Sequence, residues 1–469
     1  MYEIDMNHPV HVHFIGIGGV SMSGLAALLF DRGFTVSGSD RSESALTKRM
    51  EELGIRVAIG QCAENITDDI DVCCYTAAVH SDNPEYAEAV RRGIPMLDRA
   101  VLLGQVSRYY PVSVGVAGTH GKTTTTSMIS LMLLADGQDP TVSVGGILPA
   151  IGGNLRIGHS ERFVFEACEY TNSFLNFFPT DEIILNIDAD HLDFFKDLDD
   201  IRRSFRLYAE RLPEDGFLVI NGEIPNLSEI TDSLSCTIKT YGILPDSFRP
   251  GTDSCPYSYG ANHIVFDELG RPTYDLYRDG CLVDSVTLGV IGIHNVSNSL
   301  AAIAEGERRG ISMKVMKEAL ASFTGTERRF EKKGMLGDIT IVDDYAHHPT
   351  EVKATLTAAG SVPHNRLWVV FQPHTYSRTL ALRKEFAEAL SHADRIVLAD
   401  IYAAREVNTG EISSADLAED LRKLGKEAWF LPTFSEIENF LLKNLTNGDL
   451  LITMGAGDIV KVGNHLLGK

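Results

Sequence analysis

Short apolar runs alternate with longer amphipathic stretches over residues 11–107. The runs at 12–17 (VHFIGI) and 34–40 (FTVSGSD) are typical of buried strands, and the stretches at 23–33 and 45–54 are typical of helices. Strands that alternate with helices in this way indicate a parallel sheet with helical crossover connections.

The same alternation starts again twice further along the chain. A buried strand at 112–118 is followed by a glycine-rich loop and by a predicted helix at 126–137. Further strands are expected at 163–167, 183–187, 339–345, 366–372, 395–400 and 449–455. A polar, turn-rich stretch at 244–263 is expected to be an excursion from the second unit.

The alternation of strands and helices begins three times along the chain, which predicts three domains. A chain of 469 residues is too long for one hydrophobic core. We expect an α/β protein with three tandem domains: a Rossmann-like domain at 1–107, a central domain with a mainly parallel sheet at 108–324, and a second Rossmann-like domain at 325–469.

Composition and charge narrow the class of protein. Hydrophobic residues make up 44% and charged residues 23%, as is ordinary for globular proteins, and no apolar run approaches the ~20 residues that span a bilayer. The N-terminus lacks the pattern of a secretory signal, and the seven cysteines lack paired C-x-x-C spacing, so we expect a reduced, cytoplasmic protein without membrane insertion. A net charge of −22 argues against nucleic acid as a partner, although backbone N–H groups can still hold small anions.

The strongest chemical signal is the sequence G-T-H-G-K-T at 118–123. The general phosphate-loop pattern would require glycine at position 116, where the chain has Val116. The rest of the loop still suits a nucleotide, because glycines let N–H groups approach a phosphate, Lys122 supplies a positive charge and Thr123 offers a hydroxyl to Mg²⁺. The central domain is therefore expected to be a phosphate-loop ATPase. A plain turn with a surface lysine would not explain the four threonines, which are poor helix starters.

Two later segments could complete a metal site beside this loop. Glu166 lies near the end of one predicted strand, and Asp190, His191 and Asp193 follow the next. Loops at the carboxyl ends of parallel strands meet at one edge of the sheet, so a carboxylate and a histidine there could hold a second Mg²⁺. Taken alone, His191 could also be a capping or packing residue.

Other polar residues allow more than one interpretation. Asn295 and Asn298 lie three apart on one face of a predicted helix, but asparagine also favours helix caps. The adjacent side chains of His347 and His348 diverge, so a substrate loop or a simple turn is favoured over a metal site. Arg378 follows the predicted strand at 366–372 and is either a binding residue or an exposed charge.

The first glycine loop, HFIGIGGVSMSG at 13–24, also has two interpretations. Gly16, Gly18 and the acidic Asp40 suit a dinucleotide-binding site, which would make the protein a nicotinamide-dependent dehydrogenase. Against this, the third fingerprint position is Ser21, and a dehydrogenase does not need the second loop at 118–123. A helix N-terminus of this kind suits the diphosphate of another ligand equally well.

Six motifs in register resemble the Mur ligases, the ATP-dependent amide-forming enzymes of peptidoglycan precursor synthesis. They are GTHGKTT at 118–124, N-x-x-x-D-H-x-D at 186–193, HNxxN at 294–298, RRF at 328–330, DDYxHHPTE at 343–351 and FQPHxYSR at 371–378. The resemblance covers nearly the whole chain, with the motifs in matching order and spacing.

The resemblance implies a fold and an activity. The N-terminal domain would hold a UDP-sugar, the central domain would be the ATPase, and the C-terminal domain would hold an amino acid. The enzyme would use ATP and Mg²⁺ to join L-alanine to the lactyl carboxylate of UDP-N-acetylmuramate through an acyl phosphate. The chain would act as a monomer or a homodimer.

The resemblance also implies roles for individual positions. The catalytic residues would be Lys122, Glu166 and His191, and the metal ligands would be Thr123, Glu166 and His191. ATP would contact Gly118, Thr119, His120, Gly121, Lys122, Thr123, Thr124, Asn295, Arg329 and Asp344. The UDP-sugar would contact Gly16, Gly18, Gly19, Ser39 and Asp40, and the amino acid would contact Tyr345, His347 and Arg378.

The chain departs from the family pattern in three places. Thr375 stands where some members have an arginine, which leaves Arg378 to bind more of the amino acid carboxylate. The stretch at 167–175 (ACEYTNSFL) replaces a more acidic version, which counts against an extra carboxylate there. The stretch at 201–210 has no lysine, so no carbamylated lysine is expected.

Two other functions fit parts of the pattern. A ligase that attaches a recycled peptide to the same sugar would share all six motifs. A nucleotide-binding regulator without catalytic activity would not need the retained Lys122, Glu166 and His191.

Overall fold

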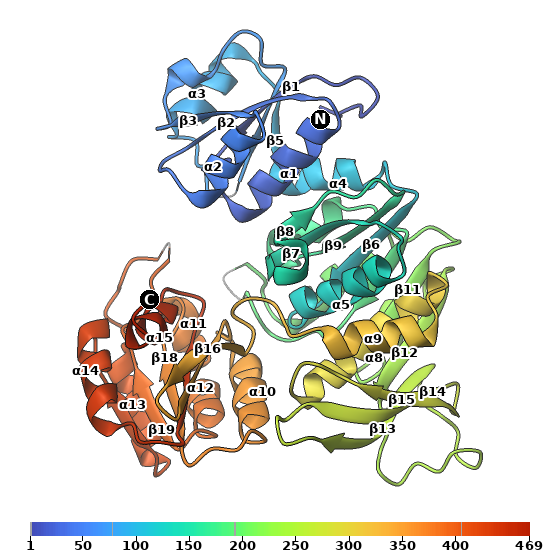
Figure 1. Cartoon of the computed structure of the whole chain (residues 1–469). Helices are drawn as coiled ribbons and strands as arrows, with labels where there is room; N and C mark the ends of the chain where they lie inside the picture. The colour runs from blue at the N-terminus through green and yellow to red at the C-terminus, as the bar shows by residue number, and fades with distance from the viewer. Residues whose placement is uncertain (1, 77, 192–193, 405) are drawn as a thin grey trace. The chain divides into compact units, whose positions relative to one another are not determined.

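The computed structural model describes residues 2–76, 78–191, 194–404 and 406–469 (Figure 1). The described residues form two compact units. Unit 1 contains the chain up to Ile187, Asp199–Thr240 and Ala301–Ile311, and unit 2 contains Asp188–Leu198, Tyr241–Leu300 and Ser312–Lys469.

The N-terminal part of unit 1 is built on a five-stranded parallel sheet, drawn in blue in Figure 1. Its strands, in spatial order, are β3 (Arg56–Ile59), β2 (Thr35–Asp40), β1 (His11–Ile15), β4 (Val72–Tyr75) and β5 (Met96–Asp98). Its helices are α1 (Val20–Asp31), α2 (Ala45–Glu52), η1 (Ala63–Asn65), α3 (Pro84–Arg92) and α4 (Arg99–Ser107). The strand order is that of a Rossmann-like sheet, which confirms the prediction for this region.

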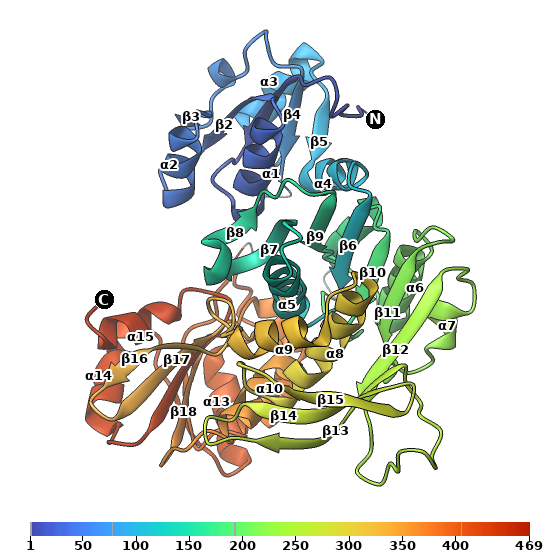
Figure 2. The ribbon, with the colours of Figure 1, turned by 45° about the vertical axis from the view of Figure 1, so that its right-hand side comes forward.

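A second sheet forms the rest of unit 1. Its strands, in order, are β11 (Phe217–Asn221), β10 (Asp181–Ile184), β6 (Val112–Ala117), β9 (Arg162–Glu166), β7 (Thr141–Leu148) and β8 (Gly153–Arg156), all parallel except β8. Its helices are α5 (Lys122–Ala135), η2 (Pro149–Ile151), η3 (Tyr170–Asn176), α6 (Leu198–Ala209) and α7 (Ser228–Thr231). Figures 1 and 2 both show α5 lying along β7 and β9, which it contacts.

Unit 2 contains one small group of strands and one larger sheet. The small group is antiparallel and consists of β13 (Tyr259–Phe266), β14 (Pro272–Arg278) and β15 (Cys281–Thr287). The larger sheet has the order β16 (Glu331–Leu336), β17 (Ile339–Asp344), β21 (Leu450–Met454), β18 (Leu367–Phe371), β19 (Arg395–Leu398) and β20 (Glu427–Phe430). Only β16 runs antiparallel to its neighbour in that sheet.

Helix α9 (Met313–Ser322) of unit 2 precedes the larger sheet along the chain. After residue 344, helices alternate with the strands of that sheet: α10 (Pro349–Ala359), α11 (Tyr376–Ala381), α12 (Arg383–Leu390), α13 (Ser414–Lys423), α14 (Phe434–Asn444) and α15 (Val460–Leu466). Strand β12 (Thr237–Ile243) and helix α8 (Ile293–Arg308) each run from one unit into the other along the chain. Three largely parallel sheets with helical crossovers confirm the predicted α/β class.

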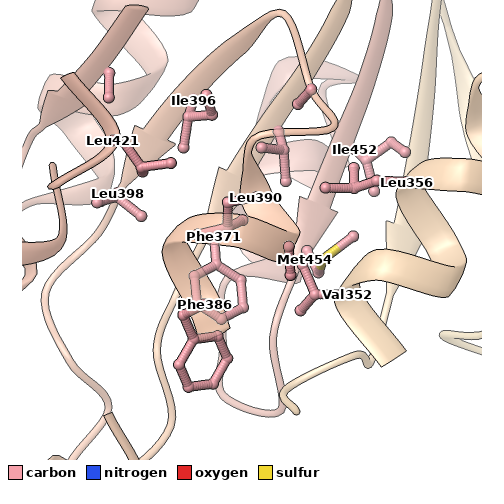
Figure 3. Packing of buried hydrophobic residues seen from close by; sticks show 14 of the residues in the cluster. Val352, Leu356, Phe371, Phe386, Leu390, Ile396, Leu398, Leu421, Ile452 and Met454 are labelled. Carbon is pink, nitrogen blue, oxygen red and sulfur yellow. The ribbon is translucent and has the colours of Figure 1, made fainter. Parts of the chain in front are cut away.

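The core on one side of the larger sheet joins strands and helices that are far apart in sequence. Figure 3 shows Phe371 of β18 beside Phe386 of α12, with Met454 of β21 and Val352 of α10 next to them. All four side chains are fully buried. Their strands read as continuous apolar runs, as expected for a parallel sheet covered on both faces.

Several predicted element boundaries are wrong. Helix α5 begins at Lys122 and not at 126, so the run of threonines forms its first turns. Ser127 Oγ donates to the Thr123 carbonyl oxygen at 2.7 Å, which satisfies this hydroxyl group within the helix. Strand β10 begins at Asp181 and not at 183, since hydrogen bonding to β6 and β11 extends to residues that the apolar pattern excluded. The turn-rich stretch at 244–263 includes the start of β13.

Among the described residues, no helix combines the length and the apolar character needed to cross a bilayer.

Glu182 of β10 is a buried carboxyl group in the middle of unit 1. Among the described residues, neither of its oxygens has a hydrogen-bond partner, and the hydroxyl of the neighbouring Tyr208 has none either. Burial raises the pKa of Glu182 well above its usual value, although the positive charge of Arg211 opposes this. The folded protein therefore keeps a proton on Glu182 that the unfolded chain releases above about pH 4.3.

The substitution Glu182→Gln removes this proton equilibrium while keeping the shape of the side chain. Because the folded-state pKa is raised, wild-type stability falls as pH rises above the unfolded-state pKa, and the variant lacks this fall. Between about pH 5 and about pH 8, the free energy of unfolding should therefore shift in favour of the variant as pH rises. Urea unfolding followed by circular dichroism measures this shift. The exposed Glu214→Gln should show no such shift, and a pH-independent difference for Glu182→Gln would contradict the raised pKa.

Candidate functional site

The carboxyl ends of β6, β9 and β10 lie at one edge of the second sheet of unit 1. Val116 is in register with Glu166, and Ala117 is in register with Ile184. The segments that follow residues 117, 166 and 184 therefore leave the sheet next to one another. This confirms the predicted convergence for the part of the chain that belongs to unit 1.

The glycine-rich loop after β6 is held by the segment after β10. Gly118 has a φ of 142°, and a Cβ atom there would lie 2.9 Å from the Cβ of Leu185. Asn186 Oδ1 accepts a hydrogen bond from the His120 N–H at 2.7 Å, and Asn186 Nδ2 donates to the His120 carbonyl oxygen at 3.0 Å. The Asn186 carbonyl oxygen also accepts from the Thr119 N–H at 3.2 Å. The first residue of the N-x-x-x-D-H-x-D motif thus fixes the shape of the loop.

Lys122 is the first residue of α5, directly after Gly121, whose φ is 86°. Its ammonium group donates to the carbonyl oxygens of Gly118 and Thr119 and to Glu169 Oε2, the last at 2.9 Å. Burial alone would lower the pKa of Lys122, but the negative charge of Glu169 raises it above its usual value. The lysine is therefore a fixed positive charge at the N-terminus of a helix, where anions bind well.

Glu169 is a residue of this site that the sequence analysis missed. The expectation of no extra carboxylate at 167–175 is wrong, because the side chain of Glu169 is only 2% exposed and forms an ion pair with Lys122. A signal was present, since Glu169 follows the buried strand that ends at Glu166 by three residues. Comparison of the stretch at 167–175 with a more acidic family pattern led to the wrong expectation that this stretch supplies no extra carboxylate.

Glu166 and Thr123 provide oxygen atoms near the same loop. Glu166 Oε1 accepts a hydrogen bond from the Gly145 N–H of β7, and a Cβ atom at 145 would lie 2.7 Å from Glu166 Oε2. A Cβ atom at Gly146 would lie 3.3 Å from Cγ2 of Thr123, the second residue of α5. A carboxylate, a hydroxyl, a lysine and helix N–H groups form a donor set that fits a nucleotide phosphate with Mg²⁺.

Among the described residues, no group of three or more His, Cys, Asp or Glu side chains could hold a metal ion. A divalent cation at this loop would therefore need phosphate oxygens of the nucleotide among its ligands, as is usual for Mg²⁺.

Arg378 lies in unit 2, where it forms an ion pair with Asp190. Its Nη2 and Nε atoms lie 2.8 and 3.2 Å from Asp190 Oδ1, and Nη1 lies 3.2 Å from His374 Nδ1. The Arg378 side chain is 11% exposed, so the alternative of an exposed charge is wrong. Thr375, which has a φ of 66°, caps α11: its hydroxyl oxygen accepts a hydrogen bond from the Arg378 N–H at 3.4 Å. This hydrogen bond fixes the position of the Arg378 backbone.

His191 also belongs to unit 2, in the segment after β10. Its φ of 54° is unusual for a residue other than glycine, and its N–H donates to Asp190 Oδ1 at 2.7 Å. Burial would raise the pKa of Asp190, but the charges of His191 and Arg378 lower it. Asp193, the last residue of the same motif, lies outside the described residues. The common metal site of His191 with Glu166 stays a prediction.

Asn295 and Asn298 lie inside α8 and contact each other. Asn298 Nδ2 donates to Asn295 Oδ1 at 3.0 Å, and Asn295 Nδ2 donates to the Ile291 carbonyl oxygen at 2.8 Å. Both side chains are buried. The alternative that Asn295 is an N-cap is wrong, because the helix begins two residues earlier, at Ile293.

Asp344 is buried at the end of β17. Its carboxylate accepts hydrogen bonds from the N–H groups of Phe330 at 2.7 Å and Ala346 at 2.8 Å, while burial raises its pKa to about 6. The carboxylate therefore ties the RRF motif to the end of the strand. Arg329 Nη1 lies 3.6 Å from Glu351 Oε1, close to the first turn of α10.

The side chains of His347 and His348 diverge, as predicted. His347 Nδ1 lies 3.0 Å from the Tyr345 carbonyl oxygen, and its ring packs edge-on against the Tyr345 ring. His348 is the N-cap of α10, where its Nδ1 accepts from the Thr350 N–H at 3.3 Å. Of the pair, His347 and not His348 belongs with the residues around Tyr345.

The first glycine loop is held from the end of β2. The carbonyl oxygen of Ser39 accepts hydrogen bonds from the N–H groups of Gly16 at 2.9 Å and Ile17 at 2.8 Å, and Asp40 Oδ2 accepts from Gly18 N–H at 2.9 Å. The hydroxyl of Ser39 is buried and donates to Glu85. Ser39 and Asp40 therefore shape the loop, and the first turn of α1 offers its N–H groups to an anion. Their direct contacts with a sugar nucleotide stay predictions.

Comparison with known proteins supports the resemblance to the Mur ligases independently of the site geometry. The chain matches the models described as "Mur ligase family, catalytic domain" at residues 11–111, "Mur ligase middle domain" at 116–306 and "Mur ligase, glutamate ligase domain" at 328–457. It is 58% identical over 469 residues to the UDP-N-acetylmuramate–L-alanine ligase of Lachnoclostridium phytofermentans, with 100% of both chains covered. The chain belongs to the Mur ligase family.

Other members of the Mur ligase family agree with this assignment. The UDP-N-acetylmuramate–L-alanine ligase of Acetivibrio thermocellus is 50% identical, with 99% of this chain and 97% of the relative covered. The crystal structure of a UDP-N-acetylmuramate–alanine ligase from Thermotoga maritima has a TM-score of 0.80 and 29% identity, with 98% of each chain covered. A murein peptide ligase from Psychrobacter arcticus shares the fold, with a TM-score of 0.70, 24% identity and 98% of each chain covered.

The Arg378–Asp190 ion pair of this Mur ligase ties the segment after β10 to α11. The substitution Arg378→Met removes two charge-assisted hydrogen bonds, so local opening of that segment should become about tenfold or more easier. Hydrogen exchange at the Phe194 and Phe195 amides, which bond to the His191 carbonyl oxygen, reports this opening. Arg383→Met breaks a different ion pair of unit 2, with Asp420, and serves as the control. Equal exchange in both variants would refute the role of the pair.

Proposed function

We propose that this Mur ligase joins L-alanine to the lactyl carboxylate of UDP-N-acetylmuramate at the expense of ATP. The observation that carries the proposal is the identity of 48–58% with curated ligases of this name, over nearly the full length of each chain. The glycine-rich loop with Lys122 and Thr123 at a helix N-terminus supports ATP as the energy source.

The residues of unit 1 would hold the nucleotide. Lys122 would supply positive charge to the transferring phosphoryl group, and Thr123 and Glu166 would bind Mg²⁺ together with phosphate oxygens. When bound, the cation would neutralise charge on the phosphates. In the family pattern, His191 would share a second cation with Glu166, and Asn295, Arg329 and Asp344 would contact the nucleotide.

The chemistry would take two steps. A lactyl carboxylate oxygen attacks the γ-phosphorus, the bond from that phosphorus to the oxygen bridging to ADP breaks, and ADP leaves with the electron pair. The neutral amine of L-alanine then attacks the acyl carbon, phosphate leaves, and the nitrogen loses a proton to give the amide. Both steps depend mainly on positioning and on stabilising moving negative charge.

The remaining contacts follow the family pattern. The UDP-sugar would lie at the loop of Gly16, Gly18 and Gly19, against the N-terminus of α1, with Ser39 and Asp40 nearby. L-alanine would lie near Tyr345, His347 and Arg378, and its carboxylate would compete with Asp190 for Arg378. We further propose domain boundaries at 107/108 and 324/325, a cytoplasmic location, and a monomer or homodimer.

The substrate assignment predicts a specific pattern of phosphate release. With UDP-N-acetylmuramate, ATP and Mg²⁺, the protein should release phosphate with L-alanine at a higher kcat/KM than with L-serine, glycine or a tripeptide. Turnover with the tripeptide alone would instead assign the protein to peptide recycling. Phosphate release with none of these acceptors would refute a ligase, and quenching of NADH fluorescence at micromolar protein would favour the dehydrogenase.

The role of Lys122 predicts a large kinetic effect. Lys122→Ala should lower kcat/KM by about 10³-fold, because it removes the fixed positive charge that would stabilise the phosphoryl group during its transfer. The circular dichroism spectrum should remain that of the wild type. Near-normal activity of a folded Lys122→Ala would show that the loop does not serve the reaction.

A further inference from the structure

Glu85 is a buried carboxylate at the start of α3, in the N-terminal part of unit 1. It is the second residue of the helix, after the N-cap Asn83 and Pro84, and it is fully buried. The hydroxyl of Ser39 donates to Glu85 Oε2 at 2.5 Å, and Asn65 Nδ2 donates to Glu85 Oε1 at 2.5 Å. Carboxylates are almost never fully buried without partners. Here the partners come from two other segments, so Glu85 ties the start of α3 to both of them.

Ser39 connects Glu85 to the first glycine loop. The Ser39 hydroxyl has a single proton, which it gives to Glu85, and the residue is fully buried, so this hydroxyl is not available to donate to a ligand. The Ser39 carbonyl oxygen accepts hydrogen bonds from the N–H groups of Gly16 at 2.9 Å and Ile17 at 2.8 Å. The position of the loop therefore depends on where Glu85 holds Ser39.

Asn65 provides a second connection to the end of β2. Besides Glu85, its Nδ2 atom donates to the Gly60 carbonyl oxygen at 2.9 Å, and the Gly60 N–H donates to the Asp40 carbonyl oxygen at 2.8 Å. Asp40 is the last residue of β2, and its carboxylate accepts from the Gly18 N–H. Glu85 thus holds, directly or through Asn65, both residues of β2 that hold the loop.

The first glycine loop lies too close to β2 to move independently of it. A Cβ atom at Gly18 would lie 2.7 Å from Asp40 Oδ2, and a Cβ atom at Gly38 would lie 2.7 Å from the Cβ of Ile17. Close packing of this kind transmits small displacements. A shift at the end of β2 therefore shifts the loop and the first turn of α1, which follows it.

We propose that Glu85 is a positioning residue for the binding of the sugar nucleotide. Its two oxygens hold the end of β2, and with it the first glycine loop, so that the N–H groups at the N-terminus of α1 are placed for the diphosphate. The inference rests on the proposed function, which puts the UDP-sugar at this loop. Glu85 acts as a hydrogen-bond acceptor for Ser39 and Asn65 and does not contact the ligand.

The substitution Glu85→Met tests this role by binding alone. Methionine has a similar length but no oxygen, so Ser39 and Asn65 each lose an acceptor. The full-length protein is titrated calorimetrically with UDP-N-acetylmuramate, in the presence of Mg²⁺ and the β,γ-imido analogue of ATP. Affinity for the UDP-sugar should fall about tenfold, whereas affinity for the analogue alone should stay within about threefold of wild type. Unchanged affinity for the UDP-sugar, or an equal loss for both ligands, would overturn the proposal.

Two control variants separate the acceptor from the charge and from the helix. Glu85→Gln keeps an oxygen that can accept from Ser39, so its affinity should stay within about threefold of wild type. Glu88→Met removes a carboxylate of the same helix that pairs with Arg91 and Arg92, and should bind as the wild type does. A loss in either control equal to that in Glu85→Met would overturn the proposal.

A double-mutant cycle tests the connection through Ser39. Ser39→Ala removes the hydroxyl but keeps the backbone carbonyl, and should also weaken UDP-N-acetylmuramate about tenfold. Because both substitutions break the same hydrogen bond, the double variant should bind within about twofold of Glu85→Met alone. A double variant about a hundredfold weaker than wild type would overturn the connection. Wild-type affinity in Ser39→Ala would overturn it as well, even if Glu85→Met does not fold.

Turnover gives a further readout and separates this inference from the proposed function. In Glu85→Met, KM for UDP-N-acetylmuramate should rise about tenfold while kcat stays within about threefold, because Glu85 positions the loop and takes no part in bond making. A fall in kcat with an unchanged KM would overturn the proposal. If the wild type itself fails to bind UDP-N-acetylmuramate, the proposed function is refuted. If the wild type binds it and the affinity is insensitive to Glu85, the ligase assignment stands and only the positioning role is lost.

Discussion

The candidate nucleotide site depends on the parallel pairing of β6 with β9 and β10. This register places the phosphate loop, Glu166 and Asn186 at one sheet edge, although up to 68 positions separate them along the chain. Gly118 has to be a glycine, because its φ is 142° and a Cβ atom there would meet Leu185, and a side chain at Gly145 would displace the carboxylate of Glu166. The loop is thus shaped by close approach to its neighbours as much as by its own sequence.

Much of the fold could be predicted from the sequence because its strands are buried on both faces. Parallel strands such as β18, fully buried over Leu367–Phe371, read as continuous apolar runs. Strands that depart from this pattern were missed or predicted with wrong bounds. The antiparallel strands β13 to β15 mix exposed and buried positions and were not predicted. Strand β10 was predicted to begin at 183, because the charged Asp181 and Glu182 at its start hid two residues that pair on both sides.

Residues of the candidate site could be predicted where they belong to a sequence motif. Their interaction partners could not be predicted, because tertiary contacts determine those partners. Lys122 was predicted from its loop, but its partner Glu169 was not, since no spacing rule connects the two. Arg378 was predicted as a binding residue, yet its pairing with Asp190 joins positions 188 apart. Long-range contacts of this kind depend on tertiary packing, which a single sequence does not display.

One arrangement recurs at three strand ends and explains why acidic residues there are difficult to assign. Asp40, Glu166 and Asp344 are each the last residue of a parallel strand, β2, β9 and β17, and each carboxylate accepts a hydrogen bond from a backbone N–H of a neighbouring segment. Such charge-assisted bonds are stronger than neutral ones and hold the loops that form the site. A ligand or cation that uses one of these carboxylates must therefore share it with the backbone. The same side chain shapes the loop and supplies negative charge, so these two roles cannot be separated by removing the carboxylate.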